Sequence, residues 1–317
     1  MNLQLLSVVF SFRNEEDNIP ALVSRVTKSI QLINNINYEL IFVNDDSTDN
    51  SKECLSNLIN EGYPITIINM SRNFGGTPCI LAGFKYAKGD MIIYMDSDLQ
   101  DPPELIPKMI QKYREGYEVV HTRRLTRDGE SKFKLWLTKK AYSIINFSSE
   151  FELPKNVGDF KLLSKKVVDE ILKIEEYDPY LRGLSIWVGF KQGFVEYNRE
   201  ARYMGDTKFP IFKSNAPAKE FLRGLLSNSG LPLITILFIG IIAILLSFTL
   251  VIYSIIIKIK DETAVGIPSI IITISFFSGL IIFTNGIIAL YMSRIYNQIK
   301  GRPKYIIESV YSKTITK

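Results

Sequence analysis

Residues 89–104, which read GDMIIYMDSDLQDPPE, are the stretch that decides the fold. The run 91–95 is short and apolar, as is typical of a strand buried in a parallel sheet. Asp96 and Asp98 follow it two residues apart, so an extended backbone would direct both carboxylates to the same side. Ligands of open α/β sheets bind at this carboxyl end of the strands. The stretch therefore predicts a ligand site at the end of a buried strand.

The two carboxylates also indicate what kind of ligand the site would take. Neighbouring carboxylates repel each other unless one keeps its proton or a cation lies between them. A divalent ion with oxygen ligands, completed by phosphate oxygens, commonly resolves such repulsion. Asp101, two prolines and Glu104 then predict the start of a helix that Asp101 caps. The alternative interpretation is a solvated acidic turn between a strand and a helix.

Composition divides the chain into a soluble part and an apolar part. The 317 residues are 46% hydrophobic, and the excess of apolar residues lies after Leu231. The net charge of +5 is modest, and its basic residues gather near the apolar segments, which suits an anionic membrane surface better than a nucleic acid. His121 is the only histidine, which argues against His-based metal chemistry and a Ser-His-Asp triad. Cys54 and Cys79 are the only cysteines, and a disulfide or zinc site is not expected.

The first hundred residues alternate between strand and helix patterns, which predicts an α/β fold with a Rossmann-like, mainly parallel sheet. The expected strands are 5–12, 38–43, 65–68 and 91–95. The first three are followed by polar or glycine-bearing loops, at 13–18, 44–49 and 71–76. Parallel strands would place these loops on the same rim as Asp96, a layout typical of nucleotide binding.

Two uncharged apolar segments, 231–257 and 264–292, each exceed the roughly 20 residues that a helix needs to cross a bilayer. Basic residues precede the first segment and follow the second, so the positive-inside rule places both termini and the soluble part in the cytoplasm. We therefore expect a catalytic domain over 1–209, an interfacial amphipathic segment over 210–230, and a two-helix transmembrane anchor with a basic cytoplasmic tail over 231–317.

In their order along the chain, four motifs resemble the inverting glycosyltransferases of family two, which have a GT-A fold. The similarity is greatest to the polyprenyl-phosphate branch, which includes dolichol-phosphate mannose synthase and the bactoprenol glucosyltransferases. The motifs are RNFG at 72–75, DSDLQDP at 96–102, GDF at 158–160 and GDTKF at 205–209. The chain departs from the family pattern in two places, the first motif and the loop after the second strand. Ser11 and Arg13 replace a proline and an aromatic residue, and Asp46 replaces a glycine that easily adopts a positive φ.

The resemblance implies roles for individual residues. Nucleotide-sugar contacts would come from Glu15 and Asp45 at the base and ribose, from Arg124 and Arg127 at the phosphates, and from Arg72 and Asp96, with Asp98 as a catalytic residue. Mg²⁺ or Mn²⁺ would be held by Asp96, Asp98 and Gln100. Arg202 and Lys208 would take the lipid phosphate, although a basic patch that only touches anionic lipid is the alternative.

Asp159 is the position where the family places a catalytic base. A phosphate monoester has its second pKa near ~6, so an acceptor of this kind carries little proton to remove at neutral pH. Orientation of the acceptor, or a contact with the metal, is therefore an equally good role for Asp159.

The expected function is inverting, metal-dependent sugar transfer to undecaprenyl phosphate at the cytoplasmic face of the cell membrane, which would supply a lipid-linked sugar for cell-envelope glycosylation. UDP-glucose is the first candidate donor, with N-acetylglucosamine and mannose left open. Membrane lipid, a separate flippase and a downstream glycosyltransferase are the expected partners, nucleic acid is not, and self-association is left open. The alternatives are a membrane-anchored glycosyltransferase with another lipid or glycan acceptor, and a non-catalytic scaffold that binds sugar nucleotides.

Overall fold

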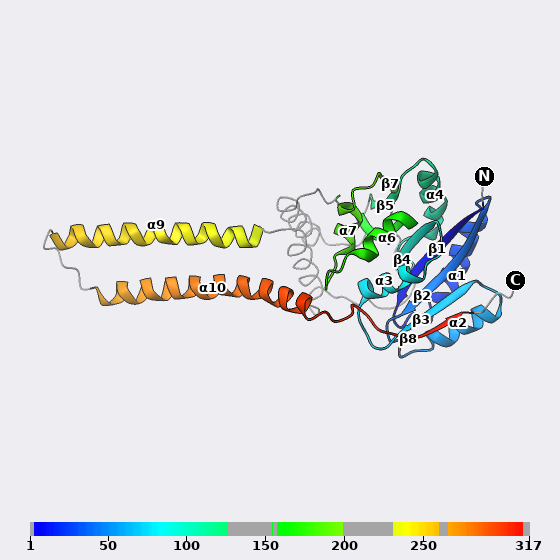
Figure 1. The fold of residues 1–317 in the computed structure, drawn as a ribbon, viewed down its shortest axis with the longest axis horizontal. Helices are drawn as coiled ribbons and strands as arrows, with labels where there is room; N and C mark the ends of the chain where they lie inside the picture. The colour runs from blue at the N-terminus through cyan, green and yellow to red at the C-terminus, as the bar shows by residue number, and fades with distance from the viewer. Residues whose placement is uncertain (1–2, 126–153, 155–156, 199–230, 260–265, 313–317) are drawn as a thin grey trace.

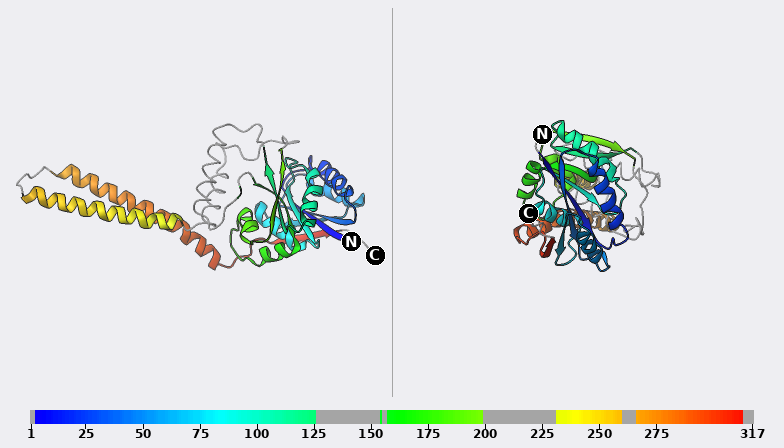
Figure 2. Two further views of the ribbon diagram at one scale, coloured as in Figure 1. Left: turned by 90° about the horizontal axis from the view of Figure 1, so that it is seen from above. Right: turned by 90° about the vertical axis from the view of Figure 1, so that its right-hand side faces the viewer.

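The computed structural model describes residues 3–125, 154, 157–198, 231–259 and 266–312. An α/β domain occupies one end, and the two long helices α9 (Leu231–Ile259) and α10 (Ile267–Ile299) extend side by side away from it (Figure 1). The view from above shows the same separation (Figure 2). The molecule thus places its apolar helices outside the α/β domain.

One sheet runs through the α/β domain, in the order β7-β5-β6-β4-β1-β2-β3-β8. Its strands are β1 (Gln4–Phe12), β2 (Ile36–Asn44), β3 (Ile65–Met70), β4 (Met91–Asp96), β5 (Val119–Arg124), β6 (Val157–Ser164), β7 (Gln192–Tyr197) and β8 (Ile307–Ser312). The first four strands are parallel, as are β5 and β7, whereas β6 runs antiparallel to β4 and β5 and β8 antiparallel to β3. The predicted α/β class and mostly parallel sheet are confirmed.

Helices cover both faces of the sheet. On one face lie α1 (Ile19–Gln31), α2 (Ser51–Asn60) and α4 (Ile106–Arg114), which follows the short 3-10 helix η1 (Pro103–Leu105). On the other face lie α3 (Gly76–Tyr86), α6 (Lys165–Lys173) and α7 (Leu181–Trp187). Alternate residues of β1 enter the two cores, Val8 and Phe10 on the first face and Val9 on the second, as the period of a strand requires.

The expectation of two membrane spans holds only in part. Among the described residues, one helical segment, Phe276–Ile299 of α10, is long and apolar enough to cross a membrane. The described apolar stretch of α9, Thr235–Leu250, is shorter than the roughly 20 residues that a crossing needs. The structure therefore shows one candidate span rather than two.

The end of the chain returns to the α/β domain after α10. In β8, Ser312 pairs with Thr66 of β3, and Asn69 Nδ2 donates a hydrogen bond to Ser309 Oγ at 3.0 Å. The residues that follow the apolar helices in the sequence therefore add an edge strand to the sheet, where only a basic tail was expected.

Candidate active site

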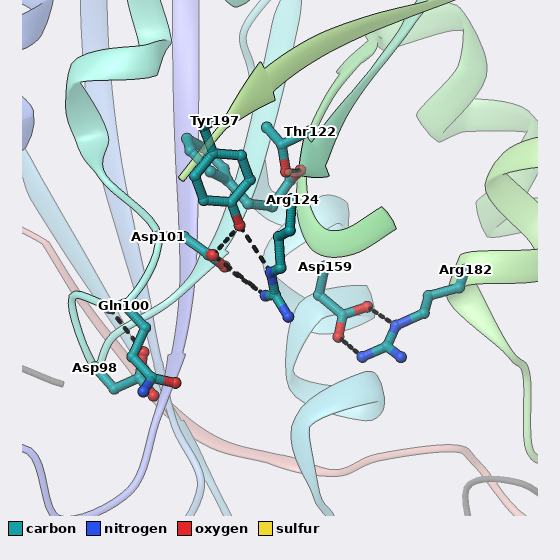
Figure 3. Close-up of polar contacts among 9 residues, drawn as sticks. Asp98, Gln100, Asp101, Thr122, Arg124, Asp159, Arg182 and Tyr197 are labelled. Atoms are coloured by element: carbon teal, nitrogen blue, oxygen red, sulfur yellow. Dashed lines mark hydrogen bonds and ion pairs between the residues drawn. The ribbon is translucent and has the colours of Figure 1, made fainter. Parts of the chain in front are cut away.

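The acidic strand end predicted from residues 89–104 lies at the rim of the sheet. Register pairs Ser11 with Asp96, so the carboxyl ends of β1 and β4 meet at one edge. Beyond Asp96 the chain turns through Leu99, which has φ +57° and a buried side chain. A left-handed backbone is uncommon for a residue with a side chain, and burial of Leu99 in the core holds it there. The backbone N–H of Gln100 then donates to Asp98 Oδ1 at 3.3 Å (Figure 3).

Negative charge is concentrated around Asp96. Burial, followed by the charges of Asp159, Asp98 and Asp101, raises the pKa of Asp96 to about 7. Such crowding fits a divalent cation, because the ion would relieve the repulsion. Within the described residues, no three His, Cys, Asp or Glu side chains form a metal-binding group. That Asp96, Asp98 and Gln100 hold such an ion, with oxygens of a ligand completing its coordination, stays a prediction.

Asp101 belongs to a buried ion pair. Arg124 Nη2 donates to its two carboxylate oxygens at 3.2 and 3.3 Å, and the Tyr197 hydroxyl also donates to it. Arg124 Nε in turn donates to the Tyr197 hydroxyl oxygen at 2.9 Å (Figure 3). The prediction that Asp101 caps a helix is wrong, because Pro102 is the N-cap of η1. The carboxylate of Asp101 binds the charged guanidinium of Arg124 instead, which is a stronger partner than backbone N–H groups. A contact of Arg124 with phosphate stays a prediction.

Asp159 on β6 forms a second ion pair, with Arg182 in the first turn of α7. Arg182 Nε donates to Asp159 Oδ1 at 2.7 Å, and Nη2 donates to Oδ2 (Figure 3). Burial alone would raise the pKa of Asp159, but the charge and hydrogen bonds of Arg182 outweigh it and lower that pKa to about 2. Sequence reasoning missed Arg182, and the available signal was a single cation at the start of an otherwise apolar stretch.

Lys161 lies two residues after Asp159 on β6 and is fully buried. Its Nζ donates to Ser185 Oγ on α7 at 2.7 Å. Burial lowers the pKa of Lys161 to about 7, with Asp159 opposing that shift and Arg182 adding to it. When it is protonated, Lys161 adds a second positive charge beside Asp159, and this charge helps to keep Asp159 ionised.

Glu15 and Asp45 lie at the ends of the neighbouring strands, and both are buried. Glu15 Oε2 accepts a hydrogen bond from Asn18 Nδ2 at 2.6 Å. The two oxygens of Asp45 accept the backbone N–H groups of Phe74 and Gly75 at 2.7 and 3.0 Å. Asp45 thus joins the end of β2 to the loop before α3.

Arg72 lies in that loop with its guanidinium 4.1 Å from the centre of the Phe74 ring. It also donates to the carbonyl of Asn73 at 3.2 Å. Asp46, which stands where the family has glycine, adopts φ +59°. An aspartate therefore takes the left-handed conformation at this turn, so the departure in sequence leaves the backbone shape that a glycine would give.

The predicted residues fall into three groups. Asp96, Asp98, Gln100 and Asp159 gather where the end of β4 meets the start of β6, and Glu15, Asp45 and Arg72 lie on the loops after β1, β2 and β3. Arg127, Arg202 and Lys208 lie outside the described residues. The roles in binding stay predictions for all of them.

The structure is that of an α/β protein with a cluster of acidic residues, a candidate ligand site, at the carboxyl ends of its parallel strands. The chain belongs to glycosyl transferase family 2, whose profile matches residues 7–172. It is thus a glycosyltransferase, and the family predicted from the four motifs is confirmed.

Full-length relatives agree with this assignment. An uncharacterized glycosyltransferase, YkcC, of Bacillus subtilis (strain 168) is 39% identical over 306 residues, 96% of this chain and 94% of its own. The prophage bactoprenol glucosyl transferase homolog of Escherichia coli (strain K12) is 35% identical over 96% of this chain and 99% of its own. The bactoprenol glucosyl transferase of Shigella phage SfV is 34% identical over 96% and 98%.

Among solved structures, glucosyl-3-phosphoglycerate synthase from Mycobacterium tuberculosis in complex with Mn²⁺, UDP-glucose and phosphoglyceric acid is 17% identical to this chain. The match covers 71% of this chain and 79% of that one, with a TM-score of 0.49.

Proposed function

We propose that this glycosyltransferase moves a sugar, glucose as the first candidate, from a UDP-sugar to undecaprenyl phosphate at the cytoplasmic face of the cell membrane. The observation that carries the proposal is the acidic end of β4, where the charges of Asp98, Asp101 and Asp159 crowd Asp96. The full-length similarity to proteins named bactoprenol glucosyl transferase supports the acceptor. The catalytic domain would be of the GT-A type.

On the donor side, Asp96, Asp98 and Gln100 would hold Mg²⁺ or Mn²⁺ against the diphosphate. When bound, the ion supplies charge stabilisation for the departing nucleoside diphosphate. The base and ribose would lie against Glu15 and Asp45, at the ends of β1 and β2.

On the acceptor side, the state of Asp159 favours orientation over proton removal. A carboxylate whose pKa is held near 2 is a weak base at neutral pH. A phosphate acceptor carries little proton to remove, since its second pKa is near ~6. Asp159 would then help to orient the acceptor phosphate, directly or through the guanidinium of Arg182. The phosphate would attack the anomeric carbon from the face opposite the leaving diphosphate.

The membrane arrangement completes the proposal. Phe276–Ile299 would be the membrane span, with the end of α10 facing the cytoplasm. Arg294 lies near the end of α10, and Lys300, Arg302 and Lys304 follow it, which is the side that the positive-inside rule assigns to the cytoplasm. Arg202 and Lys208 would receive the lipid phosphate, and a separate flippase and a second glycosyltransferase would use the product.

An assay of the full chain in vesicles tests the reaction. The vesicles would contain undecaprenyl phosphate or diacylglycerol, and the donors would be UDP-glucose, UDP-N-acetylglucosamine and GDP-mannose. We expect transfer to undecaprenyl phosphate from one UDP-sugar. Transfer to diacylglycerol alone would support the other acceptor class, and donor binding without any transfer would support the scaffold.

Two variants test the division between donor and acceptor sites. Asp98→Asn should weaken binding of the nucleotide diphosphate and abolish turnover, because it removes one charge from the site facing the diphosphate. Lys208→Ala should leave donor binding unchanged and raise the apparent KM for the lipid. Equal loss of UDP binding in both variants would contradict this division.

A further inference from the structure

The side chain of Gln298 attaches the loop between α6 and α7 to the end of α10 through two hydrogen bonds. Gln298 Oε1 accepts the backbone N–H of Tyr177 at 2.6 Å, and Gln298 Nε2 donates to the carbonyl of Glu175 at 2.6 Å. The amide therefore satisfies one donor and one acceptor of the loop, two residues apart, from the last turn of the candidate membrane span.

Two other contacts join the same parts of the chain. Lys304 Nζ donates to the carbonyl of Ile174, and Arg294 lies 3.9 Å from Asp178. A cavity of about 490 Å³ beside these contacts is lined by Gln298, Lys304 and residues of α3, α6 and the loop. Ile174, Glu175 and Tyr177 of the loop line this cavity, so directed polar contacts help to fix this part of the loop.

The loop leads directly into α7, which touches the candidate active site at two residues. Arg182 holds both oxygens of Asp159. Ser185 accepts from Lys161 Nζ at 2.7 Å and donates to the carbonyl of Arg182 at 3.0 Å. The position of α7 therefore determines the position of the Arg182 guanidinium relative to Asp159 (Figure 3).

We propose that Gln298 is a positioning residue for sugar transfer: it fixes the α6–α7 loop to the end of the membrane helix, and thereby holds Arg182 against Asp159. The proposal rests on the proposed function, because it assigns the effect to the acceptor side of that site. Its consequence is that the acceptor side is aligned by the helix that leaves the membrane, where a lipid phosphate would be presented.

Hydrogen exchange in the full chain, reconstituted in nanodiscs, tests the physical link without any need for turnover. In Gln298→Ala, exchange of the Tyr177 amide and of the amides of α7 should rise at least about tenfold. Asn297→Ala is the matched control, because Asn297 lies in the same turn and lines the same cavity. Unchanged exchange in Gln298→Ala, or an equal rise in both variants, would overturn the proposal.

Kinetics then test the path of the effect. A displacement of about 1 Å in a reacting geometry can cost up to ~10²-fold, so we expect kcat to fall about tenfold in Gln298→Ala with donor affinity unchanged. If Gln298 acts through Arg182, adding Gln298→Ala to Arg182→Gln should cost no more than Arg182→Gln alone. Losses that multiply in the double variant would overturn the proposal. Absence of sugar transfer in the unmodified chain would instead refute the proposed function, while the exchange result would still decide the physical link.

Discussion

Two aspartate–arginine pairs lie at the rim of the sheet (Figure 3), and their side chains differ in exposure to solvent. In the Asp101–Arg124 pair the side chains are 2% and 14% exposed, and Tyr197 hydrogen-bonds to both. In the Asp159–Arg182 pair the side chains are 28% and 31% exposed. The first pair has its polar groups satisfied within the protein, whereas the second leaves part of each charge open to a ligand.

We expect this difference in burial to separate a structural role from a functional one. The buried pair joins the turn after β4 to β5 and β7, so losing one partner should cost stability. The accessible pair lies beside the carboxylates that crowd Asp96, so losing one partner should cost activity. Both pairs join the same two residue types, so only their burial and partners distinguish them.

The largest expected effect concerns the accessible pair. Asp159→Asn should lower kcat by about 10²-fold, because the acceptor loses an oriented carboxylate, while the unfolding temperature changes little. The loss should be constant from pH 6 to pH 9, since Arg182 keeps the pKa of Asp159 near 2 and the carboxylate is ionised over that whole range. A pH–rate profile at saturating donor measures this. Recovery by more than about tenfold between pH 6 and pH 8, beyond that of the wild type, would show instead that Asp159 is a base.

The converse is expected for the buried pair. Asp101→Asn should reduce the free energy of unfolding by about 3 kcal/mol, because it leaves the Arg124 charge largely desolvated without its carboxylate. The kcat of the molecules that remain folded should change less than about threefold. Urea unfolding in detergent measures the loss, and Asp101→Asn combined with Arg124→Gln is the control that should recover part of it. A large fall in kcat with normal stability would reverse the assignment of the two pairs.

Lys161, beneath the accessible pair, gives a smaller effect that depends on pH. Burial lowers its folded-state pKa to about 7, below the ordinary value of 10.5 expected in the unfolded chain. Between these values the unfolded state binds more protons, so the free energy of unfolding should rise with pH. From pH 7 to pH 8.5 the wild type should gain roughly 1.5 kcal/mol relative to Lys161→Met. Parallel pH dependences in urea unfolding of the two proteins would contradict a buried, depressed Lys161.

The smallest effect should come from a third pair, which sets the scale for the other two. Arg25 binds Glu104 with two hydrogen bonds, at 2.9 and 2.7 Å, but the side chains are 27% and 54% exposed. Arg25→Gln should therefore reduce the free energy of unfolding by less than about 1 kcal/mol, and salt should reduce the difference further. A loss as large as that of Asp101→Asn would show that exposure does not govern these pairs.

The sequence predicted those parts of the molecule that depend on local patterns. The strands β1 to β4 and the helix α1 follow from apolar spacing, and the crowding of carboxylates at Asp96 follows from the residues after β4. The left-handed turn at Asp46 follows from the glycine that the family has there.

Features that depend on distant partners were not predictable in this way. The strand β8 is mostly exposed and pairs with β3, so no local apolar pattern marks it. Arg182 meets Asp159 only because α7 packs beside β6. Asp101 has the sequence of a helix cap, but the tertiary contact with Arg124 prevails over that local preference.

Sugar transfer by the full chain in vesicles with undecaprenyl phosphate, measured with Mg²⁺ or Mn²⁺ and with EDTA, tests the central claim most directly. We predict transfer that falls to background on chelation, returns when the ion is restored, and is absent in Asp98→Asn under every condition. Transfer that continues unchanged in EDTA and in Asp98→Asn would show that the acidic end of β4 is not the site of the reaction.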